Sequence, residues 1–72
     1  MKTILIEKTT VGSGSGECEV IMVHDQANKQ SSYVYTNEMN YKNWVIDQAD
    51  SFRSNGYKIF NNTDIVLNEL TQ

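Results

Sequence analysis

The sequence predicts a small α+β fold in which one helix packs on one face of a small antiparallel sheet of four to five strands, in the order β-β-β-α-β-β. Short β-branched and alternating apolar segments are separated by glycine-, serine- and asparagine-rich breaks. One stretch in the second half has helical periodicity instead. The chain has no proline and no internal repeat, and no linker divides it. Residues 1–72 are therefore expected to form a single domain.

The first half of the chain predicts three strands. Residues 2–11 contain an Ile-Leu-Ile run followed by Thr-Thr-Val, and residues 17–24 alternate strictly between two faces. The Gly-Ser repeat at residues 12–16 between them predicts a flexible loop, so the two strands are expected to form an antiparallel hairpin. After a polar connection, residues 32–36 predict a short third strand.

The second half predicts the helix and the remaining strands. At 100° per residue, one narrow stripe is formed by Tyr41, Val45, Gln48 and Phe52. Asn55-Gly56 ends the helix, because glycine adopts the left-handed conformation without strain. Residues 57–60 predict a strand and residues 61–64 a turn. Residues 65–70 are expected to be a last strand, with one helical turn as the alternative.

Composition excludes several classes of function. Nine acidic and six basic residues give a net charge of −3, and the lysines never cluster, so binding of nucleic acid is not expected. No apolar run is long enough to cross a membrane, and no signal peptide is recognisable at the N-terminus. The single cysteine excludes a disulfide within the chain and favours a reducing cytoplasm.

No motif for catalysis, a cofactor or a metal is found. The glycine loop leads into a strand rather than a helix, and its spacing fits neither nucleotide-binding pattern. Cys18 and His24 share a strand face but lie about 20 Å apart, too far for a nucleophile and its base. Cys18 is expected to be a small buried hydrophobe, and His24 a residue at a strand end. We therefore predict a protein that is not an enzyme and has no catalytic residues, cofactor or metal site.

The first two strands carry apolar residues on both faces, whereas one helix can cover one face only. If Val20 and Met22 meet the helix, the other face is exposed and forms an interface with an acidic rim. The predicted partner-binding residues are then Leu5, Glu7, Glu17, Glu19, Ile21, Val23, Tyr33 and Tyr35. The alternative is that the C-terminal segment folds over this face. On the first assignment, Ile21→Glu abolishes binding but not folding, and Val20→Glu unfolds the domain.

In size, charge, asparagine content and β-β-β-α order, the chain resembles the small acidic proteins encoded by phages and mobile elements, of which anti-CRISPR proteins are best known. The resemblance is one of general character and carries over no residue. It implies an inhibitor in the host cytoplasm that covers the nucleic-acid-binding or active surface of a larger, basic host defence protein or nucleoprotein complex. The alternative is a homo-oligomeric accessory or assembly module with no inhibitory role, for example a homodimer.

Overall fold

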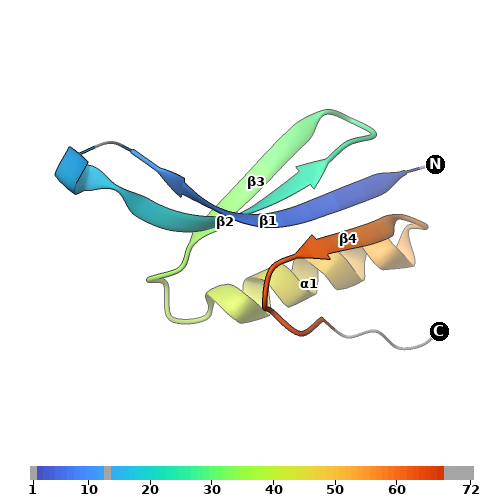
Figure 1. Cartoon of the computed structure of the whole chain (residues 1–72). Helices are drawn as coiled ribbons and strands as arrows, with labels where there is room; N and C mark the ends of the chain where they lie inside the picture. The colour runs from blue at the N-terminus through green and yellow to red at the C-terminus, as the bar shows by residue number, and fades with distance from the viewer. Residues whose placement is uncertain (1, 13, 68–72) are drawn as a thin grey trace.

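The computed structural model describes residues 2–12 and 14–67. It consists of four strands, one α-helix and one short 3₁₀ turn (Figure 1). In chain order these are β1 (Thr3–Val11), η1 (Gly14–Gly16), β2 (Cys18–Asp25), β3 (Gln30–Tyr35), α1 (Tyr41–Ser54) and β4 (Lys58–Asn62). The α+β class, the single helix and the position of each of these strands confirm the fold expected from the sequence.

The sheet is mixed, with the strand order β3-β2-β1-β4. β2 pairs antiparallel with both β1 and β3, whereas β4 pairs parallel with β1. The parallel pair arises because α1 carries the chain back along one face of the sheet, from the β3 edge to the opposite edge (Figure 1). The sheet is thus not wholly antiparallel. Residues 65–67 are not in a strand, and the rest of the predicted last strand lies outside the described residues.

The core lies between the sheet and α1. Its buried members are Ile4, Ile6, Ile21, Val23, Val45, Ala49, Ile65 and Leu67. The strands contribute through their register, because Ile6 pairs with Val23 and therefore faces the same side of the sheet. The half-buried Val34, Trp44 and Phe52 pack around this cluster.

This register corrects the face assignment made from the sequence. Ile21 and Val23 were expected on the exposed face, but they are 0% and 3% exposed and belong to the core. Val20 and Met22 point to the opposite face, together with Leu5. Val20 is nevertheless fully buried, between its cross-strand neighbours Thr9 and Tyr35. A shift of one residue in strand pairing exchanges the two faces completely, which accounts for the error.

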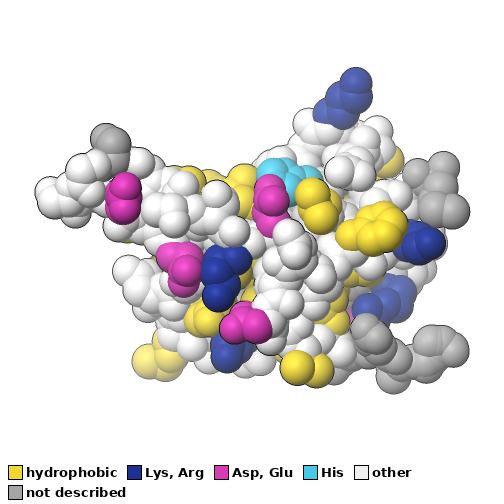
Figure 2. Space-filling view, in the orientation of Figure 1, with side chains coloured by type: hydrophobic (Ala, Val, Ile, Leu, Met, Phe, Trp, Pro, Cys, Tyr) yellow, Lys and Arg dark blue, Asp and Glu magenta, His cyan; other side chains and the backbone are white. Residues whose placement is uncertain are grey.

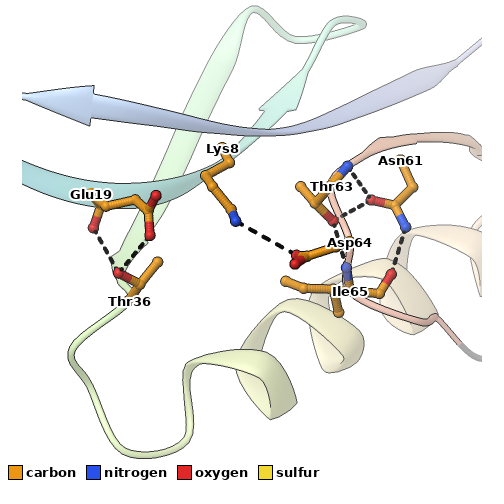
Figure 3. A network of polar contacts seen from close by, with 7 residues as sticks. All are labelled: Lys8, Glu19, Thr36, Asn61, Thr63, Asp64 and Ile65. Atoms are coloured by element: carbon orange, nitrogen blue, oxygen red, sulfur yellow. Dashed lines mark hydrogen bonds and ion pairs between the residues drawn. The ribbon is translucent and has the colours of Figure 1, made fainter.

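The segment after β4 is held by side-chain hydrogen bonds that direct it into the core (Figure 3). The Asn61 amide donates to the Ile65 carbonyl at 2.8 Å, and its oxygen accepts from the Thr63 N–H at 3.1 Å. Lys8 forms an ion pair with Asp64 at 3.7 Å. These contacts bring Ile65 and Leu67 against α1 and the sheet, so the C-terminal segment does cover a face, and it is the face that α1 packs on.

β1 and β2 extend beyond both neighbouring strands. The β1–β4 pairing ends at Glu7, and the last main-chain bond to the β3 side joins Thr36 to Glu19, so residues 10–12 and 14–18 form a projecting arm (Figure 1). Its tip turns at Gly12, whose φ of +93° favours glycine. A Cβ atom on Gly12 would lie 2.6 Å from the Gly16 carbonyl oxygen. The arm therefore depends on this glycine for its closure.

Candidate functional site at the open face and outer edge of the sheet

The face of the sheet opposite α1 is partly apolar and exposed. Phe60 on β4 lies beside Leu5 on β1, and Tyr33 on β3 lies beside Met22 on β2. Tyr33 and Phe60 are 52% and 50% exposed. Figure 2 shows hydrophobic side chains on this surface next to an imidazole and a carboxylate. We call this surface the open face.

The structure brings half of the predicted partner-binding residues together. Leu5, Glu7, Tyr33 and Tyr35 share the open face. Ile21 and Val23 are excluded because they are in the core.

The two remaining glutamates of the predicted acidic rim lie elsewhere. Glu19 pairs with Thr10 and is on the α1 side of the sheet, where the Thr36 hydroxyl donates to its carboxylate at 3.3 Å (Figure 3). Glu17 is exposed at the tip of the arm. The three glutamates therefore do not form one rim around the open face.

A polar network that sequence reasoning missed crosses the open face on three strands. His24 Nδ1 lies 2.7 Å from Ser31 Oγ, and His24 Nε2 lies 2.8 Å from Glu7 Oε2. The carboxylate accepts from Nε2–H, so in the neutral imidazole Nδ1 accepts from the serine hydroxyl. The side chains meet because His24 pairs directly with Ser31 and lies diagonally from Glu7. We interpret the network as a link between β1, β2 and β3.

This network can be predicted only when the pairing of β1, β2 and β3 is known. The hydroxyl, imidazole and carboxylate are far apart in sequence, and each is an ordinary polar residue of a strand. Cys18 also differs from expectation, because it is exposed on the arm rather than buried. Its thiol lies 3.8 Å from the Gly16 carbonyl oxygen.

The outer edge of β3 carries main-chain groups that face away from β2. The Thr36 N–H donates to the Glu19 carbonyl at 3.1 Å, which makes Thr36 and Glu19 a hydrogen-bonded pair. Hydrogen-bonded and non-hydrogen-bonded pairs alternate along antiparallel strands. Val34 and Ser32 therefore also form main-chain hydrogen bonds to β2. The N–H and C=O groups of the residues between and beside them point away from β2; these residues are Ser31, Tyr33 and Tyr35. The Tyr35 carbonyl accepts from Glu38 N–H at 3.1 Å, consistent with this alternation. Within the described residues, β3 has a strand on one side only.

A hollow of about 490 Å³ lies beside this edge, within the usual size range of ligand sites. It is lined by residues 33–35 of β3, by the connection at residues 38–40, and by Tyr41 and Trp44 at the start of α1. Asn40 occupies the N-cap position of α1 without a side-chain capping bond. Its lining thus includes aromatic residues and one acidic residue, Glu38.

The two tyrosines of β3 connect the hollow with the open face. Their rings pack edge to face, with centroids 5.4 Å apart and an interplanar angle of 89°. Hydrogen bonding with Tyr33 raises the pKa of the Tyr35 hydroxyl above its ordinary value. The open face, the free edge and the hollow therefore meet at these two residues.

Comparisons with protein-family models, with curated proteins and with solved structures found no match to this chain. The described part of the chain contains no group of three or more His, Cys, Asp or Glu side chains that could hold a metal ion. None of the described residues belongs to a helix long and apolar enough to cross a membrane.

Proposed function

We propose that this chain is a protein-binding domain that pairs an extended segment of a partner protein with the outer edge of β3. The observation that carries the proposal is the outward main chain of Tyr33, which lies beside both an exposed aromatic face and a hollow. In binding by strand addition, main-chain hydrogen bonds supply affinity, and pockets for alternate side chains supply specificity. The outer edge of β3 offers outward main-chain groups for the first and the adjacent hollow for the second.

The two edges of the sheet differ in how far they are protected. Exposed edges are commonly blocked by charges, proline, bulges or a covering segment. β3, with the sequence Gln-Ser-Ser-Tyr-Val-Tyr, has no charge and no proline, and it pairs with β2 without a bulge. β4 begins with Lys58 and is followed directly by the turn that Asn61 holds. The contrast favours β3 as the edge that accepts another strand.

A second copy of this chain is a less suitable occupant than a different protein. If two β3 strands paired around a two-fold axis at Tyr33, Ser31 of one copy would face Tyr35 of the other, and no charges would oppose the pairing. The Tyr35 carbonyl, however, already accepts from Glu38 N–H. Ser32 of one copy would then lie opposite Val34 of the other, on the side where α1 packs. A serine side chain is too small to fill the hollow, so we infer a partner segment with a larger side chain there.

The more specific hypothesis of a phage inhibitor of a host defence protein stays a prediction. Its argument from charge is weakened, because Glu17 and Glu19 do not border the open face and Glu7 is engaged by His24. What remains in its favour is the net charge of −3 and an exposed apolar surface. The homodimeric module is the alternative that the same edge allows.

Substitution of Tyr33 tests the proposal. Proline at an outward-facing edge position removes the N–H that a partner would use but no hydrogen bond to β2. Tyr33→Thr removes the same ring and keeps the N–H, so it is the matched control. Extended peptides are selected from a random library on the wild-type domain, and their affinity for both variants is measured. Amide hydrogen exchange of Tyr33 is followed with and without peptide.

The expected result is protection of the Tyr33 amide by the peptide and a clearly larger loss of peptide affinity in Tyr33→Pro than in Tyr33→Thr, which loses the ring but keeps the N–H. Selected peptides that bind equally to both variants and leave the Tyr33 amide unprotected would contradict strand addition. Sedimentation of the wild-type domain and Tyr33→Pro without peptide tests the alternative. A dimer that Tyr33→Pro dissociates would favour the homodimeric module over a separate partner.

A further inference from the structure

We propose that the hollow beside β3 binds a positively charged side-chain group of the partner, an ammonium or a guanidinium. The inference rests on the proposed function, since it specifies the residue that the paired segment places in the hollow. It is carried by the composition of the hollow, whose lining residues include the aromatic Tyr41 and Trp44 at the start of α1 and the acidic Glu38. This combination of groups recognises organic cations.

The chemistry of the lining favours a cation over a neutral apolar group. The face of an aromatic ring carries partial negative charge and attracts ammonium and guanidinium ions, most strongly at tryptophan. Among the described residues that line the hollow, Glu38 is the one that is charged, and it is negative. Glu38 therefore repels an anionic ligand and attracts a cationic one, whereas a neutral ligand gains nothing from its charge.

Within residues 2–12 and 14–67, ammonium groups lie against aromatic rings at three positions. Lys2 lies 5.5 Å from the centroid of Tyr57, and Lys58 lies 5.6 Å from that of Phe60. The third is at the wall of the hollow, where Lys42 lies 6.0 Å from the centroid of Tyr41, near the limit of such a contact. Lys42 is exposed, so an external cation can displace it. It is expected to compete weakly with the partner's charged group.

Trp44 is the only tryptophan of the chain and lines the hollow, so its fluorescence reports binding directly. The probe is tetramethylammonium chloride, titrated against sodium chloride at equal ionic strength. Tert-butanol, which is neutral and similar in shape, is the second control. The variants are Glu38→Gln and, as a matched control, Glu17→Gln, which removes the same charge from the tip of the arm. Lys42→Gln tests the competition.

We expect a saturable change in Trp44 fluorescence with tetramethylammonium and none with either control compound. Glu38→Gln should weaken binding of the probe about fivefold, the size of one partly screened charge contact, and Glu17→Gln should leave it unchanged. Lys42→Gln should leave binding equal to wild type or tighter.

An equal response to tert-butanol, no saturable response to tetramethylammonium, or equal losses in Glu38→Gln and Glu17→Gln would overturn the inference. The probe has no main chain, so the experiment is independent of strand addition. Selected peptides that protect the Tyr33 amide but carry no enriched lysine or arginine would refute the cation site and leave the proposed function standing. Binding of tetramethylammonium without any peptide binding would refute the proposed function and leave the cation site standing.

Discussion

The two faces of the sheet are built from similar residues but differ in their exposure to solvent. On the face that packs on α1, Ile4, Ile6 and Ile21 are completely buried. On the open face, Leu5 and Met22 are half-buried, and Tyr33 is more than half exposed. The difference arises because β1 and β2 carry apolar residues on both faces, whereas α1 and the C-terminal segment cover one face only. Stability should therefore depend mainly on the α1 face, with the buried Val20 as an exception on the open face, and recognition should depend on the exposed residues of the open face.

The largest expected effect follows from a charge placed on each face. Ile21→Glu should unfold the domain, because an unpaired buried charge costs about 3–5 kcal/mol, comparable with the whole stability of a domain this small. Tyr33→Glu, on the open face, should leave the fold intact. Circular dichroism with urea denaturation measures both. A folded Ile21→Glu variant would contradict the face assignment and restore the one first expected from the sequence.

The second effect compares the polar groups of the two faces. Asp25, buried on the α1 side, accepts hydrogen bonds from Asn28 Nδ2 at 2.9 Å, from the Ala27 N–H at 3.1 Å and from Tyr57 at 3.3 Å. The Asn28 side-chain bond, with the other bonds and against the effect of burial, lowers the pKa of Asp25. Its stabilising contribution is therefore complete above the ordinary aspartate pKa of about 3.9 and is lost as pH falls through the lower folded-state value.

Asp25→Asn should accordingly lower the Tm by several degrees at neutral pH. The difference from wild type should shrink in acid, as Asp25 itself becomes protonated. Asp47→Asn, on the exposed side of α1, removes the same charge and should change the Tm little at any pH. Thermal melts from pH 7 down to pH 2 measure this. A constant difference between wild type and Asp25→Asn across that range would refute the assigned role of the ionised carboxylate.

The third effect concerns the arm, where neither face is covered. Gly12→Ala places a methyl group against the Gly16 carbonyl at a positive φ, so it should destabilise the hairpin by about 1–2 kcal/mol. Gly16→Ala has open space around the new methyl group and should be nearly neutral. Urea denaturation gives the stabilities, and amide exchange in residues 10–18 localises the change. Equal stabilities of the two variants would show that the tip does not need Gly12.

The smallest effect is expected on the open face itself. Glu7→Gln replaces the carboxylate that His24 contacts, at a position where the glutamate side chain is 38% exposed. Exposed ion pairs contribute about 0–1 kcal/mol, so the loss of stability should stay within that range. Glu17→Gln, at the arm tip, serves as the control for the change in net charge. A loss as large as that in Asp25→Asn would mean that the network on the open face supports the fold as strongly as the buried carboxylate does.

The sequence was sufficient to predict those elements that have a clear hydrophobic periodicity or a clear residue signal at their end. The helix from Tyr41 has an apolar stripe and ends before Gly56, where φ is +87° and a turn follows. The ranges of the strands follow from β-branched residues between polar breaks. The antiparallel pairing of β1 with β2 was predicted correctly, but the parallel pairing of β4 with β1 was not. The faces of the strands were not accessible either, because both faces of β1 and of β2 carry apolar residues. Local pattern therefore cannot decide whether Ile6 shares its face with Val23 or with Met22.

The candidate site was predictable only in part, for the same reason. Tyr33 and Tyr35 were identified because aromatic residues at alternate positions of a strand must share a face. The hollow was missed, since Glu38 and Trp44 reach it through a connection whose path no sequence pattern encodes. The link from Glu7 through His24 to Ser31 likewise depends on two strand registers at once.

The parallel insertion of β4 also has a consequence for the order of events during folding. The two hairpins β1–β2 and β2–β3 join neighbours in sequence, whereas β1 meets β4 only after more than fifty intervening residues have been made. Ile65 and Leu67, which complete the hydrophobic cluster, come later still. A nascent chain therefore holds three strands with an incomplete hydrophobic cluster until residues 58–67 are synthesised. Closure of this long loop is then the slow step, as expected for contacts of high sequence separation.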